Sequence, residues 1–393
     1  MLKTIKTLAG ELFPQLQAIR HHLHQHPELS FQEHQTMQFI IGKLQEWGIP
    51  YRAPVAGTGV VGLIEGQNPQ SRIVALRADI DALPIEEANE VPYRSQHPGV
   101  MHACGHDVHT TCLLGAAYIL QQLRSQWQGT VKLIFQPGEE KHPGGASLMI
   151  RDGALENPRP SCILGLHVHP ELPMGYLGFR SGISMASADE IYITIRGKGG
   201  HAASPHLTTD TILAASQVVV ALQQVISRRK DPFSPSVLSI CAFNGGYTTN
   251  VIPTEVKLLG TFRAMDETWR FRAHALIRQT VQQVASAMGA EAEVEIPVGY
   301  PCLKNDEQVT RAARTLAEQY LDAEHVKEVD PRMGAEDFAF YSQVIPACFF
   351  RLGVASPEKG VGPTVHTPQF DIDESALEIG AGIMAWLGAH IQP

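Results

Sequence analysis

Chemically active side chains recur where short apolar strands end, and this recurrence restricts the fold more than any other feature of the sequence. The strand predicted at residues 130–136 runs into Glu139 and Glu140, and the strand predicted at 162–166 runs into His167. In α/β sheets, functional residues collect at the carboxyl ends of the strands. The pattern therefore predicts an α/β fold in which separate strand ends bring these side chains to one edge of a sheet.

Residues 101–109 carry one thiol, three imidazoles and a carboxylate, and we expect them to reach the same edge just before a helix predicted at 110–126. Cys104 and His106 are two residues apart, so on an extended backbone both would face one ion, with Gly105 leaving the approach open. A thiolate with an imidazole suits zinc and its transition-metal neighbours. The pair is only part of a coordination shell. The other polar residues of the stretch are expected to support the site rather than bind the ion: His102, Asp107 and His109.

Two pairs of carboxylates have both a functional and a structural interpretation. Glu139 and Glu140 are costly to hold together unless a cation neutralises one, which suggests one ligand and one free base. A solvated acidic turn is the alternative. Asp79, which follows the apolar run 73–76, is favoured as a functional carboxylate, whereas Asp81 could equally bond local backbone in a turn.

The isolated histidines depend on the context of these strand ends. His366 follows a Gly- and Pro-rich loop, and taken alone it would be structural, as would His167. Because several segments converge on one edge, both are assigned to the metal site. Four histidines lie in the helix predicted at 12–25 or directly after it, without interleaved Cys or carboxylates, and we expect them to be solvated: His21, His22, His24 and His26.

Composition limits the class of protein. The 393 residues exceed what one hydrophobic core usually serves, so two domains are expected. The net charge of −9, without a long basic run, argues against binding of nucleic acid or an anionic membrane. No stretch approaches the roughly 20 apolar residues of a membrane span, the N-terminus does not resemble a signal peptide, and the cysteines are scattered. We expect a protein of the reducing cytoplasm that acts on a small molecule.

The middle of the chain differs from the rest. Between residues 188 and 297 the predicted order of elements is β-α-β-β-α-β, which is typical of an independently folding α+β domain. The sequence thus predicts a discontinuous metal-binding catalytic domain at 1–187 and 298–393, with the inserted domain at 188–297.

Taken together, these segments resemble the metal-dependent amidohydrolases of the aminoacylase/carboxypeptidase family, in the branch that holds hippurate hydrolases and indoleacetyl-amino-acid hydrolases. The resemblance spans nearly the whole chain. It is carried by RADIDALP at 77–84, MHACGHD at 101–107, QPGEE at 136–140, GLHV at 165–168, GGHAA at 199–203, NVIP at 250–253, GAEDF at 334–338 and HTP at 366–368.

The resemblance implies a zinc-aminopeptidase-like α/β/α catalytic domain and a ferredoxin-like lid or dimerisation domain. It also implies a binuclear site for two divalent ions, Mn²⁺ or Zn²⁺ in the first place and Co²⁺ or Ni²⁺ as alternatives. The implied ligands are Cys104, which would bridge the ions, His106, Glu140, His167 and His366. Much of the family has His-x-Asp where this chain has Arg77-Ala78-Asp79, so His106 is expected to replace that histidine, and Asp79 to act as an orienting carboxylate.

A mechanism follows from the same resemblance. Glu139 would take a proton from a metal-activated water and pass it to the leaving amine. His201, reaching the site from the partner subunit of a homodimer formed through the inserted domain, would donate to the oxyanion. Asn250 and Arg263 would grip the carboxylate of the released amino acid, although Arg263 could equally pair with a surface acid. The expected substrate is an N-acyl amino acid of the acetyl, benzoyl or indoleacetyl type.

Three alternatives stay open. A dipeptidase or carboxypeptidase would use the same chemistry on another acyl group. A non-catalytic module that binds a metal or a small molecule would have lost the base or a ligand, whereas Glu139 and every implied ligand are present. A thiol-redox role for Cys104 would leave Glu139 and His366 without a function.

Overall fold

The computed structural model describes residues 1–356 and 362–392, and the chain folds into two compact units. The first unit comprises Met1–Gly182, Lys304–Asp330 and Asp337–Pro393, and the second comprises Ile183–Leu303 and Pro331–Glu336. The limits predicted at 188 and 298 lie a few residues inside those of the second unit. Residues 357–361, which belong to the Gly- and Pro-rich loop before His366, lie outside the described residues.

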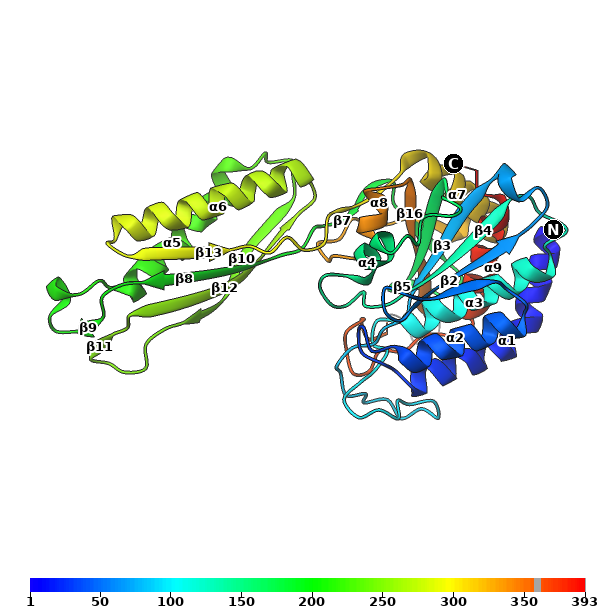
Figure 1. Ribbon diagram of the computed structural model, residues 1–393, viewed down its shortest axis with the longest axis horizontal. Coiled ribbons are helices and arrows are strands. Elements are labelled where there is room, and N and C mark those ends of the chain that lie inside the picture. The colour runs from blue at the N-terminus through cyan, green and yellow to red at the C-terminus, as the bar shows by residue number, and fades with distance from the viewer. Residues whose placement is uncertain (357–361, 393) are drawn as a thin grey trace. The chain divides into compact units, whose positions relative to one another are not determined.

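A mixed sheet forms the centre of the first unit (Figure 1). Its order, counted over the described residues, is β1-β2-β4-β3-β5-β16-β6-β15, and β3 runs parallel to both β4 and β5. The strands are β1 (Tyr51–Val55), β2 (Gly59–Glu65), β3 (Ile73–Asp79), β4 (Thr130–Gln136), β5 (Cys162–Pro173), β6 (Leu177–Phe179), β15 (Val326–Glu328) and β16 (Ala347–Ala355). Parallel β3, β4 and β5 deliver their carboxyl ends to one edge, so the predicted α/β fold is confirmed.

Helices cover both faces of this sheet because its side chains alternate between two apolar layers. On one face of the sheet, Val131 packs against α9, where a Cβ added at Gly388 would touch it. On the other face, the next residue, Lys132, donates to the carbonyls of Ala154 and Glu156, which follow α4. The helices are α1 (Leu2–Gln25), α2 (His34–Glu46), α3 (His106–Gln122), α4 (Gly145–Arg151), α7 (Glu307–Leu321), α8 (Ala339–Ser342) and α9 (Ala376–His390).

Helix α3 is buried on nearly all sides, since it packs against α1, α9 and β3. Its close approach to α9 needs a glycine, because a Cβ at Gly380 would lie 2.3 Å from Sγ of Cys112. A helix held this firmly fixes the direction in which its first turn presents side chains. That first turn begins at His106, four residues earlier than the sequence predicts.

The second unit is an antiparallel sheet with two helices on one face (Figure 1). Its elements follow the predicted β-α-β-β-α-β order, and the strand order β10-β12-β8-β13 is that of a ferredoxin-like sandwich. They are β8 (Asp189–Arg196), α5 (Thr211–Gln224), β10 (Ser236–Asn244), β12 (Glu255–Ala264), α6 (Glu267–Ala287) and β13 (Glu291–Glu295). A separate apolar core, including Ile193, Val218 and Ile277, holds this unit together.

Shorter elements complete the described chain: β7 (Gly182–Met185), β9 (Gly200–His201), β11 (Val251–Ile252), β14 (Leu303–Asn305), the 3-10 turns Pro69–Ser71, Pro205–Leu207 and Ala323–His325, and a π-helical turn at Val225–Arg229. Among the described residues, no helix combines the length and apolarity that crossing a membrane requires.

Candidate metal centre

The turn before α3 sets the positions of Cys104 and His106. The expected extended backbone is wrong, because Gly105 has φ +81° and caps the helix, so that His106 already belongs to its first turn. A Cβ at Gly105 would lie 2.6 Å from Cγ2 of Val168 on β5. Only glycine combines this left-handed conformation with so close an approach. Both side chains therefore reach the strand edge through a helix start rather than a strand end.

The structure brings all five implied ligands together. Sγ of Cys104 lies 3.3 Å from Nε2 of His366 and 3.6 Å from Nε2 of His167. Oε1 of Glu140 lies 3.1 Å from Nε2 of His366 and 3.9 Å from Nε2 of His106. The donor atoms form two groups within 4.8 Å, Cys104 with His106 and His167, and Cys104 with Glu140 and His366. Cys104 belongs to both groups, which is the placement that a bridging thiolate needs.

Unsatisfied atoms indicate what this cluster can hold. Nε2 of His106 is buried without a hydrogen-bond partner, and Oε1 of Glu140 is buried with the ion-pair contact to His366 but no hydrogen bond. Leaving buried polar atoms unpaired is costly, and a cation between such donors removes the cost. The mixture of thiolate, imidazole and carboxylate suits a divalent transition metal. The residues present thus fit two divalent cations.

The electrostatics also favour cations. Burial raises the pKa of the Cys104 thiol, and the carboxylates of Glu140, Glu139 and Asp79 raise it further. Burial alone would lower the pKa of His106, but Asp79, Asp81 and Glu140 raise it to about 10. The cluster thus carries an excess of carboxylates around a thiol that only a nearby cation can ionise.

The Asp81 carboxylate orients the ring of His106, and its role is not that of a residue in a local turn. It is buried, and its carboxylate lies 3.1 Å from Nδ1 of His106 and accepts from the Ser30 hydroxyl and the Glu140 backbone N–H. Nε2 of His106, on the other side of the ring, lies 3.7 Å from Oδ2 of Asp79 and 3.9 Å from Oε1 of Glu140. A carboxylate on the far nitrogen of a ligand histidine fixes its tautomer and its orientation.

Asp79 and His109 form the next layer. Asp79 pairs with Arg77 at 2.6 Å and with Nδ1 of His109 at 2.5 Å. Because Nε2 of His109 accepts from the Val168 N–H, its proton resides on Nδ1 and is donated to Asp79. Both Asp79 and Arg77 lie inside β3, which extends three residues beyond the predicted run.

Arg77 occupies the position at which much of the family that the sequence resembles has a histidine. Its contacts explain how an arginine fits there. Its fully buried guanidinium binds Asp79 on one side and Asp337 on the other, at 2.9 Å. Asp337 in turn donates its backbone N–H to Oε1 of Glu139 at 3.3 Å. Glu139 is buried and lies beside His106 and Glu140. The arginine therefore serves as a permanent cation that supports Asp79 and the segment holding Glu139.

One buried cluster was missed in the sequence. His24, expected to be solvated, is 1% exposed, and its Nδ1 lies 2.8 Å from Asp107. Arg20 is fully buried and also binds Asp107, which accepts these side chains instead of capping α3. The helical period carried the signal, since Arg20 and His24 follow the apolar Leu16 at intervals of four.

Of the residues predicted from the second unit, His201 and Asn250 lie on neighbouring segments, and Arg263 lies on a separate strand. His201 on β9 lies opposite Val251, and the Ala202 N–H donates to the Asn250 carbonyl, so these two segments form one end of the unit. Arg263 lies near the far end of β12, eight residues from Glu255, a separation of about 26 Å along a strand. Arg263 is therefore remote from the start of β12, and its joint role with Asn250 stays a prediction.

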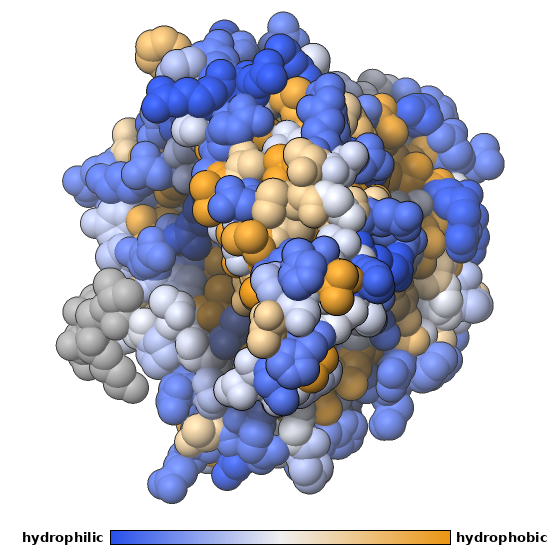
Figure 2. All heavy atoms as spheres, turned by 90° about the vertical axis from the view of Figure 1, so that its left-hand side faces the viewer, coloured by the Kyte–Doolittle hydropathy of each residue, from blue (hydrophilic) through white to orange (hydrophobic). Residues whose placement is uncertain are grey.

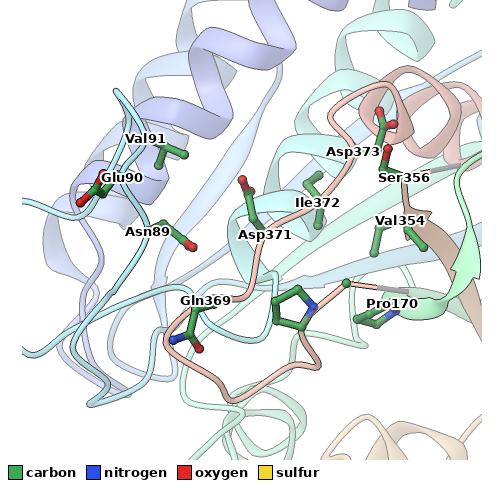
Figure 3. A pocket seen from close by; sticks show the side chains of 13 residues that line it. Asn89, Glu90, Val91, Pro170, Val354, Ser356, Gln369, Asp371, Ile372 and Asp373 are labelled. Atoms are coloured by element: carbon green, nitrogen blue, oxygen red, sulfur yellow. The ribbon is translucent and has the colours of Figure 1, made fainter. Parts of the chain in front are cut away.

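A cavity of about 440 Å³ opens beside the carboxyl end of β16 (Figure 3). Its wall includes Val354 and Ile372 together with the carboxylates of Glu90, Asp371 and Asp373, and no Lys or Arg stands among its described lining residues.

Comparison with known proteins adds a family match. Residues 75–388 match the sequence pattern of peptidase family M20/M25/M40. A putative amidohydrolase of Bacillus subtilis is 42% identical over 97% of this chain and 98% of its own. An N-acetyl-L-cysteine deacetylase of the same organism is 41% identical over 92% and 85%, and an IAA-amino acid hydrolase of Arabidopsis thaliana is 40% identical over 96% and 85%.

Solved structures agree with these sequences. A putative aminohydrolase from methicillin-resistant Staphylococcus aureus superposes with a TM-score of 0.92 at 34% identity, covering 98% of both chains. A Bacillus subtilis protein, described as a dinuclear metal binding peptidase of the M20 family, superposes with a TM-score of 0.83 at 35% identity, covering 97% of this chain and 98% of its own.

Proposed function

Because this chain belongs to peptidase family M20/M25/M40 and is a hydrolase, we propose that it cleaves the amide bond of N-acyl amino acids with two bound divalent cations. The observation that carries the proposal is the convergence of four donor side chains, those of His106, Glu140, His167 and His366, on Cys104, with Nε2 of His106 buried and without a hydrogen bond. The relatives named as an N-acetyl-L-cysteine deacetylase and an IAA-amino acid hydrolase support an acylated amino acid as the substrate.

The proposed ligands are Cys104, His106, Glu140, His167 and His366. Divalent cations there would polarise the amide carbonyl and lower the pKa of a water from about 15.7 toward 7. Mn²⁺ and Zn²⁺ are the proposed ions, with Co²⁺ and Ni²⁺ compatible with the same donors. The chain's contribution is to hold the donors, and Asp81 and Asp79 orient them from behind.

Glu139 is proposed as the proton carrier. It lies within reach of the cluster, and the Asp337 N–H holds one of its oxygens. A carboxylate placed there can take a proton from water and deliver it to the leaving amine nitrogen. Glu140, next in sequence, acts as a ligand, so the two glutamates have different roles.

His201 is proposed to donate to the oxyanion of a partner subunit's site. Its Nδ1 accepts from the Ala203 N–H, which places the proton on the exposed Nε2, as an oxyanion donor requires. Apolar side chains are exposed in its neighbourhood, among them Leu207 and Val251. Figure 2 shows the surface from this end of the second unit, where apolar residues are interspersed with polar ones.

A homodimer through the second unit is proposed on the same grounds. Strand β10 is an edge of its sheet, and it exposes Val237 and Phe243. Unpaired edges of this kind are ready partners for a second copy. Asn250 and Arg263 are proposed to bind the carboxylate of the amino acid that is released.

A substrate panel tests the proposal. Protein freed of metal with a chelator is reloaded with Mn²⁺, Zn²⁺, Co²⁺ or Ni²⁺ and given N-acetyl, N-benzoyl and N-indoleacetyl amino acids beside unblocked dipeptides. We expect release of free amino acid from the acylated compounds only after reloading. Release confined to the dipeptides would favour the peptidase alternative, and equal rates with and without chelator would contradict a metal-dependent hydrolase.

A further inference from the structure

Arg20 is a buried cation that the proposed mechanism does not use. It lies on α1, its side chain is inaccessible to solvent, and it binds three carboxylates. The distances are 3.2 Å from Nε to Asp107, 2.6 Å from Nη2 to Asp371 and 2.9 Å from Nη1 to Glu374. Tyr93 covers the guanidinium at 4.9 Å from the ring centroid and donates its hydroxyl to Asp371.

The three carboxylates belong to two segments that carry proposed ligands. Asp107 directly follows His106, at the start of α3. Asp371 and Glu374 follow His366, on a segment that lies outside any helix or strand until α9 begins. Arg20 is thus a link between the two parts of the chain that meet at Cys104.

The segment of His366 needs such a link. His366 itself has φ +63°, a left-handed conformation that a non-glycine residue holds only when its surroundings enforce it. Its side chain is half exposed, and its backbone is held through a bond from its N–H to the Ala103 carbonyl. A small shift of this segment would move Nε2 of His366 away from Cys104 and Glu140.

The two arms of the link differ in their surroundings. The Asp107 arm is dry, since both side chains are about 1% exposed, and His24 also contacts Asp107. On the other arm, Asp371 lines the 440 Å³ cavity and is 29% exposed (Figure 3). The solvent-facing arm is therefore the one that can be released without leaving a charge buried and unpaired.

We propose that Arg20 is a positioning residue, whose guanidinium ties the segment of Cys104 and His106 to the segment of His366 so that both sets of donors stay at the spacing for two cations. This inference rests on the proposed metal site. Arginine suits the role because its planar fork carries five donors in fixed directions. A lysine ammonium is a single point of charge and cannot reach three carboxylates on different sides.

The first test is Arg20→Lys, titrated as metal-free protein with Co²⁺ alone. Heat of binding and the visible absorption of Co²⁺ bound to a thiolate report on the donors directly, without catalysis. We expect wild-type protein to bind two equivalents and Arg20→Lys to bind one of them at least about tenfold more weakly, with an altered spectrum. The fold is expected to survive, because His24 still neutralises Asp107.

The second variant, Asp371→Asn with Glu374→Gln, releases the His366 arm and leaves the dry Arg20–Asp107 pair intact. It should reproduce the loss of affinity seen with Arg20→Lys. The matched control is Arg270→Lys in the second unit, where an equally buried arginine binds Asp189 and Glu267. We expect the control to melt at a lower temperature yet bind both equivalents with wild-type affinity.

The outcomes separate the inference from the function on which it rests. Wild-type protein that binds no Co²⁺ would overturn the proposed metal site. Wild-type binding of two equivalents, with the same affinities and spectrum in both test variants, would overturn the role of Arg20 and leave it as a fold-stabilising ion pair only.

Discussion

At the scale of single residues, the site separates side chains that face a common centre from side chains that hold them. Cys104 and His366 face the centre, whereas Asp81, Asp79 and His109 bond the far sides of donors or of one another. The sequence predicted the first group from the convergence of several segments and from the family resemblance, since His366 taken alone would have been assigned a structural role. It did not predict the role of Asp81, because the same carboxylate would also suit a turn.

Replacing Asp81 by Asn should weaken metal binding. The amide loses the negative charge that faces Nδ1 of His106 and so orients the ring less firmly. Mutations of such supporting carboxylates typically cost about 10–100-fold in metal affinity, and we expect a loss in that range. Competition with a chromophoric chelator measures it.

Asp306→Ala is the matched control for this variant. Asp306 caps α7 by accepting from the Gln308 and Val309 N–H groups, away from the metal cluster. Its loss should cost about 1 kcal/mol of stability and leave metal affinity unchanged. Equal affinities in Asp81→Asn and wild type would show that Asp81 does not support the site.

At the scale of elements, the sequence predicted which segments form strands and helices better than where they end. Hydropathy ended β3 at Leu76, because Arg77 and Asp79 are charged, yet the strand continues while these residues satisfy each other inside. Likewise β5 continues through His167 to Pro173. Polar residues that pair across distant segments cannot be recognised from a local pattern. For Arg20 and His24 the helical period indicated burial, but nothing local indicated their distant partner Asp107.

Gly105, at the start of α3, packs closely against β5. Its replacement by alanine should lower the stability of the fold and weaken metal binding. The positive φ costs roughly 1–2 kcal/mol for a residue with a side chain, and crowding against Val168 adds about 1–3 kcal/mol. We expect the free energy of unfolding in urea to fall by about 2–5 kcal/mol, together with weaker metal binding. Gly99→Ala is the control, because Gly99 also has a positive φ but no atom within 4 Å of an added Cβ. A similar loss in both variants would mean that packing on Val168 contributes nothing.

At the scale of the whole molecule, the order β-α-β-β-α-β was readable because each element has its own hydrophobic period and the second unit has its own core. The assignment of Pro331–Glu336 to that unit was not readable, since it depends on contacts between segments more than a hundred residues apart. The dimer is likewise a property of surfaces, and it stays a prediction.

Mixing two inactive variants tests that dimer. Under the proposal, His201→Ala lacks the oxyanion donor and Glu139→Gln lacks the proton carrier, so each homodimer is inactive. A mixed dimer regains one complete site, because the Glu139 of one subunit meets the His201 of the other. After subunit exchange in equal amounts we expect about a quarter of wild-type activity. Activity that stays at the level of the separate variants, with mixed dimers demonstrated by differential tagging, would place His201 in its own subunit's site or outside catalysis.

The most direct test of the account compares metal content and rate in Glu139→Gln. The amide keeps the shape of the side chain and is not one of the five proposed ligands. We predict two bound divalent cations per chain, as in wild type, and a kcat for N-acyl amino acid hydrolysis lower by about 10²–10⁴-fold, the usual contribution of general acid–base catalysis. A Glu139→Gln protein that holds its metals and hydrolyses at the wild-type rate would contradict the account.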